Sequence, residues 1–191
     1  MNMQPDRYAT RTLLKADAAR HSELLGTPLR HGARLWIGML APRFAPVLLY
    51  RLAYACSAAG WQGLGRLISM VNFVIFGIEI ALNCKIGPGL FFPHTQGTVL
   101  GAMSIGSNAT IYQGVTIGAK GLDFSYTHEH RPVIGDCVVI GAGAKVLGGV
   151  SLGNNTVVGA NAVVITSFTE GTTVAGIPAK ALERKDPIDE I

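Results

Sequence analysis

The sequence predicts a mainly β protein, in which a stacked parallel β-helix follows an α-helical N-terminal region. Three observations predict it. An aliphatic residue returns at every sixth position between Ile80 and Ile165, glycine follows that residue in seven places, and Gly or Asn stands where a coil would turn. A six-residue period fits neither an α-helix nor a simple strand. Short repeats of this kind are typical of a β-helix.

The repeat falls into three blocks of aliphatic or aromatic residues. They are Ile80, Ile86 and Phe92; Ile105, Ile111 and Ile117; and Ile134, Ile140, Val146, Leu152, Val158 and Val164. In a solenoid each short strand points such a residue inward, and Gly or Asn takes the corners, where φ is positive. Small residues two positions earlier, such as Cys84, also point inward. We expect corners at Gly148-Gly149, Asn154-Asn155 and Asn161.

Composition narrows the class of protein. Of the 191 residues, 49% are hydrophobic and 15% are charged, and the net charge is only +4. This balance favours extensive buried surface or an oligomer over a nucleic-acid partner, because no run of Lys or Arg is present. The three cysteines have no CxxC spacing, so we expect free thiols in a reducing compartment. The first residues lack a signal-peptide pattern, so we expect a cytoplasmic protein.

The N-terminal region, residues 1–76, is expected to be helical. A first helix begins at Pro5-Asp6 and ends near Leu25, before Gly26. Thr27-Pro28 is typical of a second helix start, and further helices are expected at Val47–Ala58 and Leu64–Phe76.

The same region is apolar enough to raise the question of a membrane. Its longest uncharged run, Leu52 to Gly65, has 14 residues, whereas a membrane span needs about 20. Peripheral contact of these helices with the inner face of the cell membrane, through their arginines, stays open. We favour a helical cap that packs on the solenoid or on other subunits.

The repeat is interrupted once, by the polar segment 119–132. We expect it to be a loop extruded from a β-helix domain that spans residues 77–182, and such loops often carry function. A charged tail, residues 183–191, follows the domain and is expected to be loosely ordered.

Two groups of residues could carry chemistry. Glu79 lies 15 residues before His94; in a coil of three six-residue sides the two can share one edge, where a carboxylate would raise the basicity of the imidazole. On the residues alone, a lone histidine at a corner is the simpler interpretation. His128, His130 and Arg131 could contact substrate, with Arg131 gripping an anion. A metal site that includes His94, or a solvated loop, are the alternatives.

The sequence resembles the hexapeptide-repeat acyltransferases, in particular the serine acetyltransferases and the acetyltransferases of colanic-acid-type exopolysaccharide synthesis. The resemblance covers about residues 72–182. It rests on the repeat, the His94 segment, the loop, and the motifs Ile140-Gly141-Ala142-Gly143-Ala144-Lys145-Val146-Leu147-Gly148 and Ala175-Gly176-Ile177-Pro178-Ala179-Lys180. It implies a left-handed β-helix, an exception to the usual right-handed crossover. It also implies a homotrimer that binds acetyl-CoA between adjacent β-helices, with no metal.

The resemblance also implies roles by position. His94 matches the general base, and Glu79 matches the aspartate that orients it. Ala142 and Ala160 match small residues that flank the pantetheine arm of the cofactor, and Lys180 matches a basic position near its phosphates. We add Gly118 to the expected cofactor contacts.

Two departures concern the acceptor. The serine acetyltransferases have an aspartate directly before the catalytic histidine, where this chain has Pro93. They also have Arg-His-Pro in the loop, where this chain has His130-Arg131-Pro132. We therefore expect an acetyl-CoA-dependent O-acetyltransferase that acts on a hydroxyl of a sugar or polysaccharide precursor. Serine O-acetylation in cysteine biosynthesis is the alternative, and a non-catalytic or metal-binding β-helix trimer is the third hypothesis.

Overall fold

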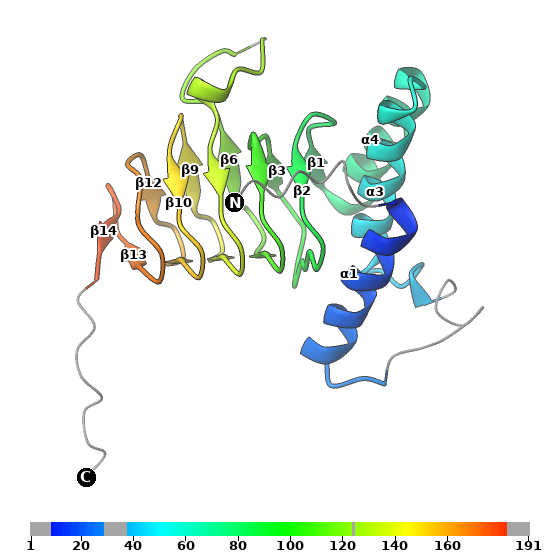
Figure 1. Cartoon of the computed structure of the whole chain (residues 1–191), viewed down its shortest axis with the longest axis horizontal. Helices are drawn as coiled ribbons and strands as arrows, with labels where there is room; N and C mark the ends of the chain where they lie inside the picture. Colours follow the sequence, from blue (N-terminus) through cyan, green and yellow to red (C-terminus); the bar gives the residue numbers. More distant parts are fainter. Residues whose placement is uncertain (1–8, 29–37, 124, 183–191) are drawn as a thin grey trace.

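The computed structural model describes residues 9–28, 38–123 and 125–182, with only the backbone at residue 128. It shows a three-sided stack of coils with helices packed at one end (Figure 1). The helices are α1 (Thr10–Leu24), α3 (Ala45–Ala58) and α4 (Gln62–Phe76). The first residues of the first predicted helix, up to residue 8, lie outside the described residues. The helix expected after Thr27-Pro28 falls on residues 29–37, which also lie outside them. The tail 183–191 also lies outside them.

Each side of the stack is a sheet of short, mostly parallel strands. Sheet A contains, in order, β1 (Ile78–Ile80), β3 (Thr98–Leu100), β6 (Thr116–Gly118), β9 (Lys145–Leu147) and β12 (Val163–Val164). Sheet B contains β2 (Lys85–Ile86), β4 (Ser104–Ile105), β7 (Val133–Ile134) and β10 (Ser151–Leu152). Sheet C contains β5 (Thr110–Ile111), β8 (Val139–Ile140), β11 (Val157–Val158), β13 (Thr173–Ala175) and β14 (Lys180–Ala181), the last of which is antiparallel.

The register of the strands gives the length of a coil. In the regular part of the stack the paired positions 145 and 163, 133 and 151, and 139 and 157 are each 18 residues apart. This is the coil of three six-residue sides that the repeat predicts. Positions 116 and 145 also pair, although they are 29 residues apart. The extra residues form the extruded loop, which stands out from the stack between β6 and β7 (Figure 1).

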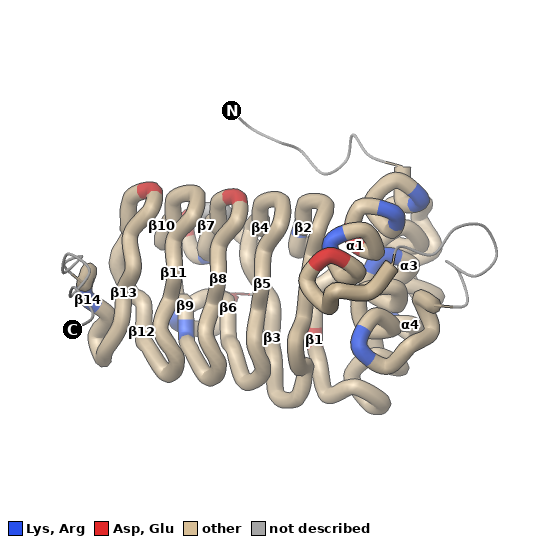
Figure 2. Tube along the Cα trace, turned by 90° about the horizontal axis from the view of Figure 1, so that it is seen from below, with Lys and Arg blue, Asp and Glu red and all other residues tan. Residues whose placement is uncertain are grey.

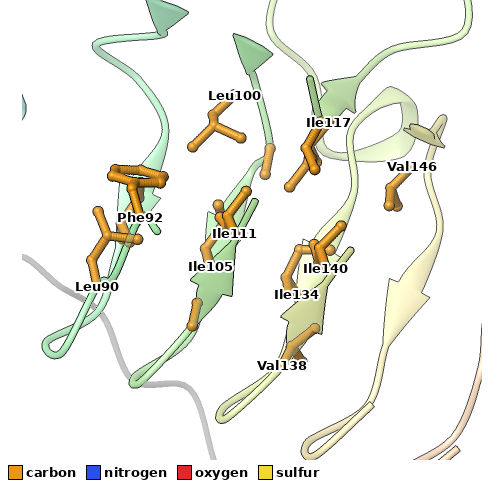
Figure 3. Packing of buried hydrophobic residues seen from close by; sticks show 14 of the residues in the cluster. Leu90, Phe92, Leu100, Ile105, Ile111, Ile117, Ile134, Val138, Ile140 and Val146 are labelled. Atoms are coloured by element: carbon orange, nitrogen blue, oxygen red, sulfur yellow. The ribbon is translucent and has the colours of Figure 1, made fainter. Parts of the chain in front are cut away.

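The interior of the stack is filled by the repeating aliphatic residues, one from each side of each coil. Their side chains form columns along the stack, as Ile105 and Ile134 do on one side and Ile111 and Ile140 on another (Figure 3). All of these residues are buried, and each buried side chain of this size contributes about 1.5–3 kcal/mol. The six-residue period therefore reflects the inward position of each side.

The corners of the coils require unusual backbone conformations. Asn155 and Asn161 have φ values of 57° and 58°, and Gly148 has a φ of 87°. These are left-handed conformations that Asn and Gly adopt at low cost. Asn108 and Cys137 turn in the same way, with φ values of 57° and 56°. The predicted positions at Gly149 and Asn154 instead have ordinary φ values.

Helix bounds agree with the sequence signals near them. α3 has a proline in its first turn, where the missing N–H costs nothing. α4 ends at Phe76 and is followed by Gly77, which has a left-handed φ of 64°; glycine is the usual residue after a helix C-terminus. β1 starts at the next residue. No helix in the described ranges is long and apolar enough to cross a membrane, and peripheral contact with a membrane stays a prediction.

The helices are fixed to the first coil by a buried ion pair. Asp17 of α1 and Arg51 of α3 form two short contacts, 2.9 and 3.1 Å, and both also bond the coil backbone. α1 lies against the first coil, and Lys and Arg gather at this helical end while the coils carry few charges (Figure 2). The expected helical cap is therefore present, packed on the solenoid.

Candidate active site

One edge of the stack carries several of the predicted site residues. The turns 93–97, 112–114, 141–143 and 159–161 each connect a strand position of sheet C to a strand of sheet A, and we call this line of turns the C–A edge. Backbone hydrogen bonds of 2.8–2.9 Å link each turn to the next, from Gly114 to Gln96, Gly143 to Gln113 and Asn161 to Ala142. His94, Ala142 and Ala160 therefore lie along one edge.

His94 and Glu79 lie near each other in the fold but are not bonded. The turn that contains His94 is tied to the start of β1, because Gly97 N donates to Gly77 O at 2.9 Å and Thr95 Oγ1 donates to Phe76 O at 2.8 Å. Glu79 follows two residues later and points out of sheet A. Both side chains are exposed, and no hydrogen bond or ion pair between these two described residues is present. Catalytic hydrogen bonds often form only with substrate bound.

Lys180 lies at the far end of the same edge. It belongs to β14 and pairs with Ala175, the last residue of β13. The neighbouring Gly176 accepts a 3.0 Å hydrogen bond from Val163 N, which places this turn one step beyond Ala160. An exposed lysine thus lies one step beyond the small residues Ala142 and Ala160 on this edge.

Sequence reasoning missed a second cation on this part of the fold. Lys145 lies on the outer face of sheet A, in register with Thr116 and Val163. Its Nζ donates to the carbonyl of Gly114 on the C–A edge at 2.5 Å. Its position directly before the inward Val146 marks it as outward-facing, but the repeat alone did not single it out.

The extruded loop is held together by Arg131. Its Nε contacts Asp123 Oδ2 at 2.7 Å, its Nη1 donates to Gly101 O at 2.8 Å, and its Nη2 donates to Asp123 O at 3.0 Å. The guanidinium also lies 3.8 Å from the centre of the Tyr126 ring. Burial opposes ionisation of Asp123, but hydrogen bonds from Ser125 and Arg131 outweigh it and lower its pKa. Arg131 thus supports the loop, and its expected contact with substrate stays a prediction.

The two loop histidines lie in a short 3₁₀ helix, His128–His130. His130 is exposed, and its Nδ1 lies 3.1 Å from Thr127 Oγ1; the side chain of His128 is outside the described part. His130 and Asp123 line a cavity of about 390 Å³ beneath the loop, which reaches Gly148 in the stack. In the part of the chain that the structure describes, no three His, Cys, Asp or Glu side chains gather as they would around a metal ion.

Comparison with known proteins gives the chain its family. The family described as "Bacterial transferase hexapeptide (six repeats)" matches residues 131–166. A serine acetyltransferase of Helicobacter pylori (strain ATCC 700392 / 26695) is 40% identical over 147 residues, which are 76% of this chain and 84% of that protein. One of Staphylococcus aureus (strain Mu50) is 45% identical over 120 residues, which are 62% and 55% of the two chains. The chain belongs to the serine acetyltransferase family.

Comparison with solved structures supports the same family. The crystal structure of Neisseria gonorrhoeae serine acetyltransferase is 28% identical with a TM-score of 0.77, over 93% of this chain and 67% of that one. A serine acetyltransferase in complex with CoA is 27% identical with a TM-score of 0.77, over 93% and 71%. These findings confirm the left-handed parallel β-helix with N-terminal helices. They also confirm the expectation of an acetyl-CoA-dependent O-acetyltransferase.

The prediction of a sugar or polysaccharide acceptor is wrong. The relatives and structures given above are serine acetyltransferases, so the findings support the alternative instead. Pro93 and the order His130-Arg131 therefore do not indicate a different acceptor. Arg131 in fact bonds the loop itself, so its order relative to His130 carries less information about the acceptor than expected.

The remaining predicted residue lies on another edge. Gly118 is the last residue of β6, at the base of the loop, and Gly148 N donates to its carbonyl at 2.8 Å. Sheet A starts at the C–A edge and ends here, at its border with sheet B. Within one chain, Gly118, His130 and Arg131 are thus separated from His94 by the width of sheet A.

Proposed function

We propose that this protein transfers the acetyl group of acetyl-CoA to the hydroxyl of serine. The observation that supports this most strongly is the 40% identity to the Helicobacter pylori serine acetyltransferase across 84% of that protein. The order of residues along the C–A edge adds a geometric reason. A base, His94, is followed by the small residues Ala142 and Ala160 and then by a cation, Lys180.

The reaction needs one base and no covalent intermediate on the enzyme. His94 takes the proton of the serine hydroxyl while the oxygen attacks the thioester carbonyl. The C–S bond then breaks, and the CoA sulfur leaves with the proton that the imidazolium returns. Glu79 stabilises the imidazolium and holds the ring once substrate brings the two together. Backbone N–H groups would stabilise the oxyanion.

Acetyl-CoA fits along the C–A edge. From the turn of His94 to the turn beside Lys180 there are four coil steps, a length of about 19 Å at the usual strand spacing. At the turns 141–143 and 159–161, Ala142 and Ala160 each present only a methyl group, so an extended pantetheine arm can lie across these two turns. Lys180 would then contact the phosphates, where a point charge suits an anion that is free to adjust.

The complete site would need a second copy of the chain. His94 lies on the C–A edge, whereas Gly118 and the loop lie on the opposite border of sheet A. A rotation that places the loop of one subunit over the C–A edge of the next is a heterologous contact, which closes into a ring. In a homotrimer of this kind, His128 and His130 of one subunit contact the acceptor beside His94 of another, and Arg131 positions that loop.

The test is release of free thiol from acetyl-CoA on addition of L-serine. His94→Ala should lower the rate by about a hundredfold or more, and Glu79→Gln should lower it as well. Glu170→Gln, at an exposed carboxylate that accepts a hydrogen bond from Asn155, is the matched control and should leave the rate unchanged. Absence of serine-dependent thiol release by the unmodified protein would refute the proposed function. Near-normal turnover by the His94 variant would remove that residue from the role of base.

A further inference from the structure

Helix α4 forms one wall of a cleft beside Glu79. The cleft has a volume of about 220 Å³ and is lined by Ser69, Met70, Phe73 and Glu79. Phe73 lies three positions after Met70 and four after Ser69, so its side chain neighbours both of theirs on the surface of α4. Glu79 faces them from the outer side of β1. No other predicted site residue lines this cleft, and the sequence signals did not select any of the three helical residues.

The cleft lies where the hydroxyl of an acceptor would have to arrive. The turn that contains His94 is bonded to Phe76 and Gly77, the two residues that join α4 to β1. The turn that carries the expected base is therefore bonded to the junction between the two walls of the cleft. A volume of 220 Å³ is below the range of about 300–1,000 Å³ typical of pockets for drug-sized ligands. The cleft suits a small acceptor.

The chemistry of the walls is mixed. The side chains of Met70 and Phe73 are 56% and 55% exposed, so they contribute little to the core. Large apolar side chains next to a carboxylate can exclude water from it and contact the carbon atoms of a ligand. The hydroxyl of Ser69 and the carboxylate of Glu79 supply polar contacts on two sides.

We propose that Met70 and Phe73 determine the size of the acceptor in this enzyme. This inference rests on the proposed function. The two side chains contact the carbon skeleton of a small hydroxy amino acid and direct its hydroxyl toward His94, while Ser69 contacts its polar end. They also limit the space for a longer chain, so that serine is accepted and homoserine is accepted poorly.

The experiment compares three variants with L-serine and L-homoserine as acceptors. Phe73→Ala and Met70→Ala should each raise the KM for L-serine about tenfold or more, because each loses an apolar contact with the acceptor. The KM for acetyl-CoA should stay unchanged, since the cofactor lies along the C–A edge. The ratio of kcat/KM for homoserine to that for serine should rise. Ile75→Ala is the control, because Ile75 is 60% exposed on the same helix but does not line the cleft.

The outcomes separate the two proposals. If the unmodified protein fails to acetylate serine, the proposed function is refuted, whatever the variants do. If it acetylates serine and both alanine variants keep the KM for serine and the homoserine ratio, this inference is overturned. An equal rise in the KM for L-serine and for L-homoserine would also overturn it, because the residues would then support the site in general. Thermal melting should be unchanged in all three variants, given the exposure of the side chains.

Discussion

Replacing Asp17 by alanine tests how the helices are fixed to the coils. The carboxylate makes two contacts with the Arg51 guanidinium, at 2.9 Å and 3.1 Å, and the two side chains are 0% and 2% exposed. One carboxylate oxygen also accepts hydrogen bonds from Gly89 N at 2.8 Å and Leu90 N at 2.9 Å. The variant thus leaves a buried guanidinium without its counter-ion and two backbone donors without an acceptor.

The magnitude follows from these losses. Removing one partner of a buried ion pair costs about 3–5 kcal/mol of the free energy of unfolding. The two unpaired backbone donors place Asp17→Ala at the upper end of that range, because each would lose a charge-assisted hydrogen bond. With a urea dependence of about 2 kcal/mol per molar, the midpoint of unfolding should fall by about 2 M. Arg51 keeps its bonds to Ile86 O and Gly87 O, which limits the loss.

The assay is urea unfolding followed by circular dichroism, at one protein concentration for all variants. Glu23→Ala, at an exposed carboxylate of the same helix, is the control and should shift the midpoint little. Asp17→Asn should give an intermediate shift, since it keeps an oxygen for the backbone donors but loses the charge. A shift below about 0.5 M for Asp17→Ala would refute the reasoning, because the pair would then contribute no more than a surface ion pair.

Two further predictions concern the coils. A Cβ atom on Gly106 would lie 2.5 Å from the backbone of Gly135 in the next coil, so Gly106→Ala should lower the melting temperature by several degrees. Gly63→Ala, where nothing lies within 4 Å, should be neutral or slightly stabilising; equal melting temperatures for the two variants would contradict the close stacking. Burial raises the pKa of the Cys84 thiol to about 12, so at pH 8 only about one molecule in ten thousand is a thiolate. Alkylation at pH 8 followed by peptide mapping should label the exposed Cys137 in the folded protein and Cys84 only after denaturation; rapid native labelling of Cys84 would count against its burial.

The coils could be predicted because each one repeats the same local requirement. A side chain that points into the stack must be apolar and of a fixed size. Residues six positions apart therefore point inward on successive sides, and those of successive coils stack in columns. Ile111 and Ile140 stack in register even though the loop lies between them in the chain. The loop was predicted for the same reason, since a break in the period cannot fit into a side of fixed length. Cys84 was placed inward by the same pattern.

The contacts between distant elements could not be predicted in this way. Asp17 and Arg51 are 34 residues apart, and nothing near either residue indicates that it is buried or paired. Arg131 appeared in the sequence as a cation in a polar loop, and only the fold shows that Asp123 and Gly101 occupy its donors. Both cases depend on contacts between residues that are distant in the sequence. No periodic pattern in the sequence indicates which partner a charged residue will have.

This difference explains why the chemistry was predicted better than the acceptor. The C–A edge, where acetyl-CoA is proposed to bind, is built from the repeats, so Ala142 and Ala160 are aligned by the same period that forms the coils. The proposed acceptor site is built from elements outside the repeat: α4, the junction at Gly77, the turn of His94 and, in the proposed trimer, the loop of a neighbour. The sequence therefore does not show which surfaces surround a single residue such as Pro93. The period of a repeat shows from the sequence alone which residues are aligned along an edge, such as the one where the cofactor is proposed to bind. The proposed acceptor site lies where the repeat meets segments that do not share its period, so the period does not predict it.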